Sequence, residues 1–246
     1  MRRAIALGFA LCGLACSGPI VEDEVHDVDP KMLAKIAVVP FAFSPEFKGS
    51  GASPAPAPPP LEPDVPVREG REKNPTALPA GKPGGASGNE GPEAAALATK
   101  MASEAFAAAG FDVIPASDVA QLFEAAGQKV PRDDRAALAA ALAREFGATA
   151  ALSGTVYRYR ERSGGELGST QPASVGIELA LHTAPGARLL WSARFDHTQQ
   201  ALSQNALVAP RYPGAGSRWL TAAELTRWGL DSAAEEVAEK LATKPQ

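Results

Sequence analysis

The fold is decided by three runs of sequence: ATAALSGTVYRYRER at residues 148–162, ASVGIELALHT at residues 173–183 and RLLWSARFDHT at residues 188–198. In the second run, large apolar residues occupy the odd-numbered positions from 175 to 181, and in the third run apolar residues occupy those from 189 to 195. A period of two is typical of strands that bury one face. The three runs therefore predict consecutive strands of a half-buried antiparallel sheet.

The alternation also predicts how the second and third runs pair. Their apolar faces match when Ile177 lies opposite Phe195, and Glu178 then lies opposite Arg194. We expect a solvated Glu178–Arg194 pair that contributes little free energy. His182 has the same phase as Glu178, so its side chain is also expected to be solvated.

Two short apolar runs outside this region predict further strands: KIAVVPF at residues 35–41 and FDVIP at residues 111–115. The first is expected to be buried on both faces and to lie centrally in the sheet. A helix is expected between the two runs. It begins near Pro92, ends at Gly110, and turns an apolar stripe that includes Met101 toward the sheet.

Three more helices are predicted from their end signals. Ser117 is expected to cap a helix that ends before Gly127, and a third helix starts near Pro131 and is terminated by Gly147. The sequence TAAE, which begins at Thr221, is a capping box that predicts the start of the last helix.

Together these elements predict an α/β (α+β) domain with a mixed sheet of about five strands and helices packed on it, in the order β-α-β-α-α-β-β-β-α. The domain is expected to consist of residues 34–43 and 93–243. Residues 44–92 hold twelve of the chain's 22 prolines and eight of its 23 glycines, which predicts a long disordered insert. The insert is either a spacer or docking site for a polyproline-binding partner or, as we prefer, a tolerated insertion in a surface loop.

The amino terminus predicts export and lipidation. Residues 1–15 combine two arginines with an apolar run and small residues, which is the layout of a signal peptide. Gly13 to Cys16 resemble a bacterial lipobox, although leucine is usual where Gly13 stands, and ordinary signal cleavage is the alternative. Residues 16–33 would then form an acidic tether anchored to the membrane by acyl chains on Cys16. In such lipoproteins, Ser17 after the cysteine implies the periplasmic face of the outer membrane.

An ordered set of short motifs resembles one known family. IAVVPF at residues 36–41, GFDVIP at 110–115, FGA at 146–148, LSGTV at 152–156 and LWS at 190–192 follow one another along the chain. The set resembles the periplasmic α/β lipoprotein group that includes CsgG, the amino-terminal domain of TolB and LpoB-type activators of peptidoglycan synthases. The group contains structural and adaptor proteins, so the resemblance implies a fold and a compartment more than an activity.

Composition argues against several classes of function. Asp and Glu number 28 against 24 Lys and Arg, without a basic patch, so no nucleic-acid partner is expected. Both cysteines, Cys12 and Cys16, lie at the amino terminus, which leaves no thiolate in the body of the chain. The three histidines lack ligand spacing, so no metal is expected. We also expect no cofactor and no small-molecule substrate.

A hydrolytic site is the one catalytic alternative. His182, Asp196 and His197, with Ser192 or Ser203, could be combined into such a set, but no strained nucleophile turn accompanies them. A nucleophile, a base and oxyanion donors cannot all be assigned, so we predict no catalytic residues and no enzymatic activity.

The segment from residue 199 to residue 219 is the predicted partner-binding surface. It is long, and it carries Arg211, Tyr212, Arg218 and Trp219, which are residue types enriched at interface hot spots. The alternative is that Tyr212 and Trp219 only fix the segment to the domain.

The sequence thus favours a non-catalytic, outer-membrane-anchored periplasmic lipoprotein that acts as an adaptor or activator by binding an unidentified envelope protein. The alternative function is an oligomeric secretion-channel or assembly component like CsgG. A channel needs alternating membrane strands, which the proline-rich residues 44–92 cannot supply.

Overall fold

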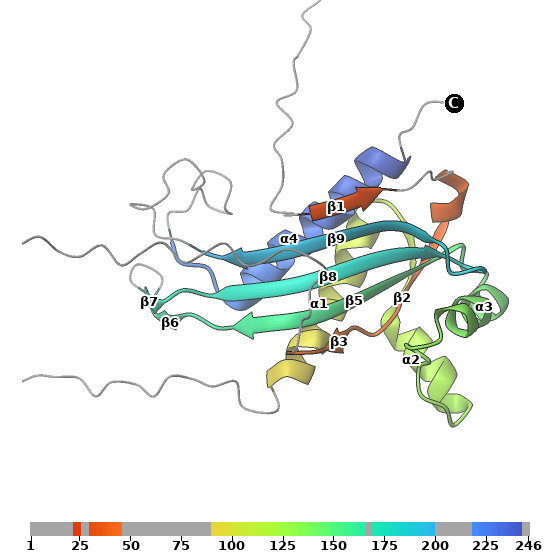
Figure 1. Cartoon of the computed structure of the whole chain (residues 1–246), viewed down its shortest axis with the longest axis horizontal. Helices are drawn as coiled ribbons and strands as arrows, with labels where there is room; N and C mark the ends of the chain where they lie inside the picture. The colour runs from red at the N-terminus through yellow and green to blue at the C-terminus, as the bar shows by residue number, and fades with distance from the viewer. Residues whose placement is uncertain (1–21, 26–29, 46–89, 166–168, 200–217, 243–246) are drawn as a thin grey trace, which may run out of the picture.

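The computed structural model describes residues 22–25, 30–45, 90–165, 169–199 and 218–242. The predicted signal peptide, Cys16, residues 46–89, Arg211 and Tyr212 lie outside these ranges. The described residues form a mixed α/β fold around one seven-stranded sheet (Figure 1), whose strands follow the order β1-β9-β8-β5-β2-β4, with β3 also paired to β5. The predicted fold class is confirmed.

The centre of the sheet is the antiparallel unit predicted from the three runs. It consists of β5 (Ala150–Arg160), β8 (Ser174–Thr183) and β9 (Leu189–Thr198). Ile177 pairs with Phe195, and Glu178 pairs with Arg194, so the predicted register is confirmed. The Arg194 guanidinium, however, bonds to Tyr157 and Asp196.

A parallel part continues the sheet beyond β5. Strand β2 (Lys35–Val38) lies between β5 and the short edge strand β4 (Asp112–Ile114), so it is next to the edge and not central as expected. Its burial on both faces is confirmed, because Ile36 belongs to one core cluster and Ala37 to the other. Strand β3 (Ala42–Phe43) follows β2 and runs parallel to β5.

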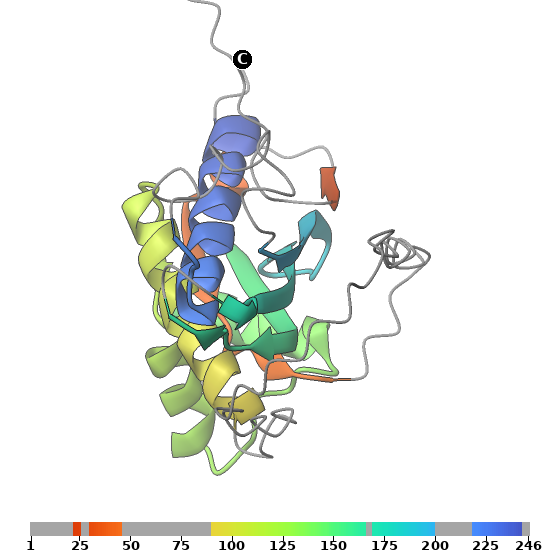
Figure 2. The ribbon, with the colours of Figure 1, turned by 90° about the vertical axis from the view of Figure 1, so that its left-hand side faces the viewer.

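Helices α1 (Glu90–Ala108) and α4 (Ala222–Val237) pack side by side on one face of the sheet (Figure 2). The expected stripe of α1 is confirmed in part: Ala105 is buried and the half-buried Met101 packs against the core, but the fully buried residues are Ala98, Ala102 and Phe106. Apart from Phe106, the buried face carries small side chains, and these alanines let the helix backbone lie close to the strands. A 3-10 turn (η1, Pro30–Leu33) precedes β2, and a π turn (η4, Ala238–Ala242) follows α4.

Helices α2 (Ala116–Ala125) and α3 (Arg135–Phe146) lie at one end of the sheet and pack on its opposite face, against Ala37 and Ala151. This covering corrects the expectation for His182. Its side chain is only 7% exposed, since the helices bury the face that the alternation assigned to solvent.

The helix ends agree in part with the sequence. Gly147 ends α3 with a left-handed backbone (φ 64°), and Thr221 and Glu224 form the predicted capping box of α4. Ser117 does not cap α2, because the cap is Pro115 and Ser117 lies in the first turn. The start of α3 is capped by Asp134, three residues after the expected Pro131.

The segment assigned to the tether contributes a strand of its own. Strand β1 (Glu22–Val25) pairs antiparallel with β9 and forms the second edge of the sheet. A small hairpin of β6 (Ser163–Gly164) and β7 (Ser169–Gln171) extends the connection between β5 and β8. No helix among the described residues has the length and apolarity to cross a membrane.

Candidate functional site

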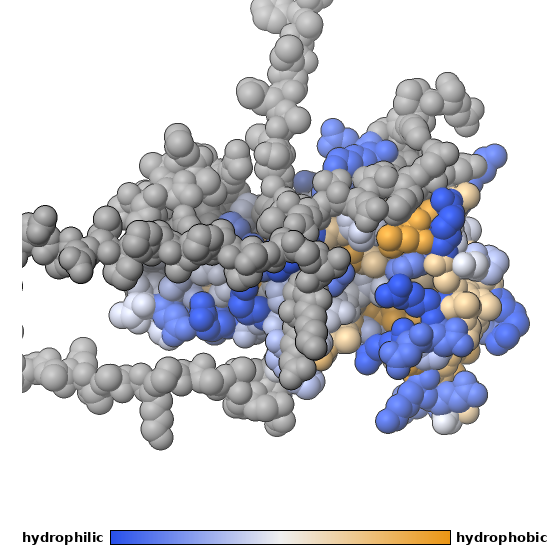
Figure 3. All heavy atoms as spheres, viewed as in Figure 1, coloured by the Kyte–Doolittle hydropathy of each residue, from blue (hydrophilic) through white to orange (hydrophobic). Residues whose placement is uncertain are grey.

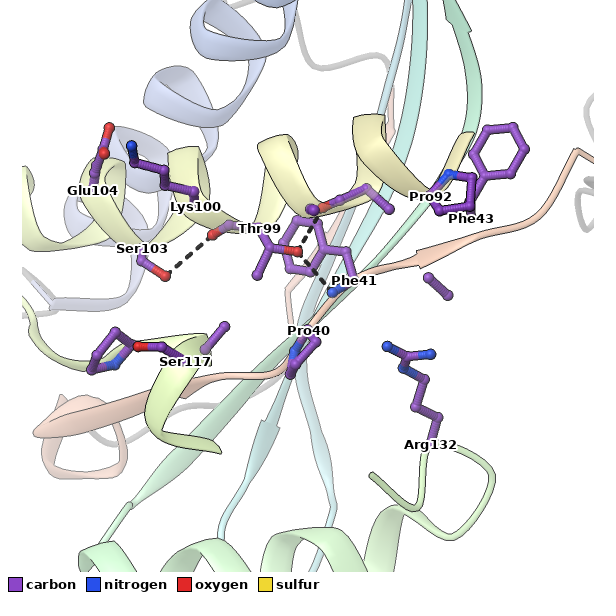
Figure 4. A pocket seen from close by; sticks show the side chains of 15 residues that line it. Pro40, Phe41, Phe43, Pro92, Thr99, Lys100, Ser103, Glu104, Ser117 and Arg132 are labelled. Carbon is purple, nitrogen blue, oxygen red and sulfur yellow. Dashed lines mark hydrogen bonds between the residues drawn. The ribbon is translucent and has the colours of Figure 1, made fainter. Parts of the chain in front are cut away.

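A cleft of about 910 Å³ lies between the β2–β3 segment and the outer side of α1 (Figure 4). We call it the β3–α1 cleft. Its lining comes from four places: the segment Pro40–Phe43, one face of α1 from Pro92 to Glu104, the start of α2 from Pro115 to Ser117, and Arg132.

The cleft exists because the sheet edge is incomplete there. Strand β4 pairs only with Lys35, Ile36 and Ala37, so β3 has no strand beside it on that side among the described residues. Pro40 lacks an N–H group and cannot extend the ladder with β4. The α1 face that looks onto this gap carries small side chains, which leave the space unfilled: Ala95, Ala96, Thr99 and Ser103.

The floor of the cleft is fixed by hydrogen bonding and close packing. The Phe41 amide donates to Thr99 Oγ1 at 2.9 Å, and the same hydroxyl donates to the Ala95 carbonyl at 2.6 Å. The Phe41 ring lies over Gly154, where a Cβ would be only 2.7 Å from a ring carbon. Phe41 is therefore held in place from both sides.

One wall of the cleft is formed by β3. The Phe43 ring packs against the backbone of Gly91, which leaves no room for a side chain at that position. The Ser44 amide donates to the Val156 carbonyl of β5 at 2.9 Å. The backbone groups of successive residues in a strand point to opposite edges, so the N–H and C=O of Phe43 point away from β5. The amide of Phe41 points to the same side, where it donates to Thr99 of α1.

The rim of the cleft carries charge. Lys100, Glu104 and Arg132 are exposed. The hydrogen bond from Arg227 of α4 holds the pKa of Glu104 below its ordinary value, although desolvation acts in the opposite direction. Lys100 also lies close enough to Glu104 to help lower that pKa, and Arg132 is a second cation of the lining. With two cations and one carboxylate, the rim carries an excess of positive charge.

A polar cluster lies on the sheet face opposite α1 and α4. Arg158 and Arg194 both bond to the Asp196 carboxylate, and the Tyr157 hydroxyl donates to it at 3.0 Å. Burial acts to raise the pKa of Asp196, but the bonds from Arg158, Tyr157 and Arg194 outweigh it and lower the pKa. Burial raises the pKa of Tyr157 to about 12. The ring of Tyr157 covers Gly176, and Arg194 stacks on it at 5.3 Å. These mutual contacts account for the cluster as packing of the sheet surface.

The residues of the hydrolytic alternative are not brought together. Val175 pairs with His197, whereas His182 pairs with Leu189, so the two histidines lie at opposite ends of the β8–β9 ladder. Burial, followed by the charge of Arg135, lowers the pKa of His182. Burial also lowers the pKa of His197, which packs against Phe195 and Trp228 on the α4 side. Ser203 lies outside the described residues.

The predicted partner-binding residues divide into two groups. Arg218 lies half-buried, and its guanidinium donates two hydrogen bonds to the carboxylate of Glu224, at 2.9 and 2.5 Å. Glu224 lies in the first turn of α4. This bond is the main reason that the pKa of Glu224 falls to about 2. Trp219 is half-buried, and Arg211 and Tyr212 lie outside the described residues. Binding at this segment stays a prediction.

No group of three His, Cys, Asp or Glu side chains suited to a metal ion occurs among the described residues. Figure 3 shows hydrophilic residues over the left-hand ends of β5 and β8, and a mixture of hydrophobic and hydrophilic residues at the end that carries α2 and α3. The β3–α1 cleft was missed by sequence reasoning. The signal in the sequence is the row of small residues along α1, which lies on another face than the predicted apolar stripe: Ala95, Ala96, Thr99 and Ser103.

Comparison with known proteins adds only distant likenesses. No family model and no curated protein matches the chain. Among solved structures, the PelC dodecamer from Paraburkholderia phytofirmans is 18% identical, with a TM-score of 0.40, over 86% of this chain and 96% of that one. Lipoprotein GNA1162 from Neisseria meningitidis is 21% identical, with a TM-score of 0.36, over 68% and 82%. The LpoB C-terminal domain from Salmonella enterica is 12% identical, with a TM-score of 0.29, over 68% and 84%.

Likenesses with such low identities and TM-scores carry no conclusion about activity, partners or assembly. One of these structures is described as a lipoprotein and another is LpoB, which belongs to the group that the sequence motifs resemble. The resemblance to CsgG and TolB stays a prediction.

Proposed function

We propose that this chain is a non-catalytic lipoprotein that works as an adaptor or activator. In this proposal it is anchored in the outer membrane, faces the periplasm and binds another envelope protein. The observation that carries the proposal is the β3–α1 cleft, which combines an apolar floor with an incomplete sheet edge and a cationic rim. Apolar grooves and open strand edges are recurring sites at which one protein binds a segment of another.

The anchor rests on the lipobox-like sequence at Cys16. Strand β1 begins at Glu22, six positions after that cysteine. An extended chain spans about 3.3–3.6 Å per residue, so six residues reach roughly 20 Å. With Cys16 acylated and β1 paired to β9, the β1–β9 edge of the sheet would therefore stay within roughly that distance of the bilayer surface.

Labelling with radioactive palmitate tests the anchor. Wild-type chain and the Cys16→Ala variant are compared, with Cys12→Ala as the matched control, because both cysteines lie in the same amino-terminal segment. We expect label in the wild type and in Cys12→Ala, and none in Cys16→Ala. Equal labelling of the two variants would contradict the anchor.

Cross-linking in intact envelopes tests the binding function and its location. Lys100→Glu changes the rim of the cleft, and Trp219→Ala changes the segment that the sequence favoured. Loss of a discrete cross-linked adduct only in Lys100→Glu supports the cleft, whereas loss only in Trp219→Ala moves binding to the 199–219 segment. An adduct that survives both changes would place binding elsewhere. Circular dichroism checks that both variants remain folded.

A further inference from the structure

We propose that the β3–α1 cleft binds an extended, proline-containing peptide segment of another protein, and that carboxylates of this peptide meet Lys100 and Arg132. The inference rests on the proposed binding function and adds the chemistry of the partner.

The shape of the cleft fits an extended chain. Strand β4 stops opposite Ala37, and the sheet edge continues through β3 without a neighbour among the described residues. The N–H and C=O of Phe43 lie on that open edge. A peptide that lies along an open strand edge gains main-chain hydrogen bonds through its non-proline residues, since proline has no N–H to donate, and strand addition is a common mode of peptide recognition.

The apolar lining favours proline and other small apolar residues. Pro40, Phe43, Pro92 and Pro115 line the cleft, as do small side chains of α1 such as Ala96. Figure 4 labels Pro40, Phe43 and Pro92 among the lining side chains. Such a surface offers rings as contact partners. Proline-rich segments already populate an extended conformation, so they lose little conformational entropy when they bind between rings.

The charge of the rim sets the charge of the peptide. Lys100 and Arg132 both line the cleft, and Arg227 bonds to the Glu104 carboxylate that would otherwise offset them. Complementary potential across an interface steers association and discriminates against wrong partners. An acidic peptide is therefore favoured over a basic one.

The insert of the same chain is a competing occupant. Residues 54–66, with the sequence PAPAPPPLEPDVP, contain seven prolines, two alanines and the acidic residues Glu62 and Asp64. The insert leaves the described domain after β3 and returns at α1, next to the cleft. An experiment on the peptide must therefore separate a partner in trans from the chain's own residues.

Fluorescence anisotropy with the full-length protein makes this test. The probe is a short synthetic peptide of alternating alanine and proline that ends in two glutamates, and the control peptide ends in two lysines. We expect the acidic peptide to bind more tightly, and added salt to weaken it, because exposed charges are screened. Reversal of both rim charges, Lys100→Glu with Arg132→Glu, should weaken binding about tenfold, which is about 1.4 kcal/mol, because two attractive charge pairs become repulsive.

Two substitutions on the same helix give the matched control. Ala96 is exposed and lines the cleft, whereas Ala107 is exposed on α1 but outside it. Ala96→Trp should abolish binding of the acidic peptide, and Ala107→Trp should leave it unchanged. Equal binding of the two peptides, or binding that survives Ala96→Trp, would overturn the proposal.

Occupation of the cleft by the chain's own insert would give a different result in the peptide experiment. Peptide binding that appears only after Glu62→Lys and Asp64→Lys in the chain itself would show that the insert fills the cleft, and would also overturn the proposal of an external partner. If the acidic peptide does not bind while envelope cross-links from the cleft persist, the proposed binding function stands and only the proposed chemistry of the peptide is wrong.

Discussion

The hydroxyl of Thr99 accepts the amide hydrogen of Phe41 at 2.9 Å, across a separation of 58 residues. This buried bond joins the two parts of the domain that lie on either side of the proline-rich insert. The hydroxyl donates in turn to the Ala95 carbonyl at 2.6 Å, so it acts both as an acceptor and as a donor. Thr99 therefore fixes the distance between the β2–β3 segment and α1, and with it the floor of the β3–α1 cleft.

Thr99→Val should destabilise the domain by about 1–3 kcal/mol, because the buried Phe41 amide loses its acceptor while the shape of the side chain is kept. Thr99→Ser retains the hydroxyl and is the matched control, with a smaller loss. Urea denaturation measures both. Equal losses for the two variants would show that the hydrogen bond has no role in stability.

Gly154→Ala should destabilise by about 1–3 kcal/mol, because the new Cβ would lie 2.7 Å from the Phe41 ring and would push it from the floor of the cleft. Gly165→Ala is the control, since a Cβ there meets no atom within 4 Å. The same change at Gly154 should weaken peptide binding. Unfolding free energies that match for the two variants would contradict this packing.

The stability supplied by Glu224 should depend on pH. Its pKa is lowered from 4.5 to about 2, chiefly by the hydrogen bond from Arg218, so its contribution is present above pH 4.5 and is lost as the pH falls toward 2. Glu224→Gln should therefore lower the melting temperature at pH 7 and have much less effect near pH 2. A difference from wild type that is the same at both pH values would contradict the account of this capping box.

Both described histidines should titrate below 6.5 in the folded protein, because burial lowers the pKa of His182 and of His197. Since the unfolded chain binds these protons more readily, stability is full above pH 6.5 and falls as the pH drops through the two folded pKa values. NMR titration of the imidazole protons gives each pKa directly. An unshifted value of about 6.5 for His182 would show that its side chain is solvated, as the strand alternation had suggested.

Much of the fold could be predicted because its signals are local. Alternation fixed the register of β8 and β9, and the capping signals at Gly147 and Thr221 mark the helix ends that the structure has. These features depend on residues that are near one another in sequence or directly opposite in a hairpin. Long-range packing plays little part in them.

The remaining features depend on which elements meet. His182 is buried because α2 and α3 cover one end of the second sheet face, and no residue of β8 itself reports that covering. The α1 stripe was expected to run through Met101, whereas the fully buried residues of this helix are Ala98, Ala102 and Phe106, on a neighbouring face that the contact with the sheet selects. The cleft needs β4 to end early beside β3, a fact of sheet topology that composition does not contain.

The most direct test of the central claim is site-specific photo-cross-linking in living cells. A photoreactive amino acid replaces Ala96, which lines the cleft, or Ala107, which is exposed elsewhere on the same helix. If the chain works by binding an envelope protein at the β3–α1 cleft, position 96 gives a discrete adduct that disappears with Lys100→Glu, and position 107 gives none. No adduct from position 96, or the same adducts from both positions, would contradict the claim.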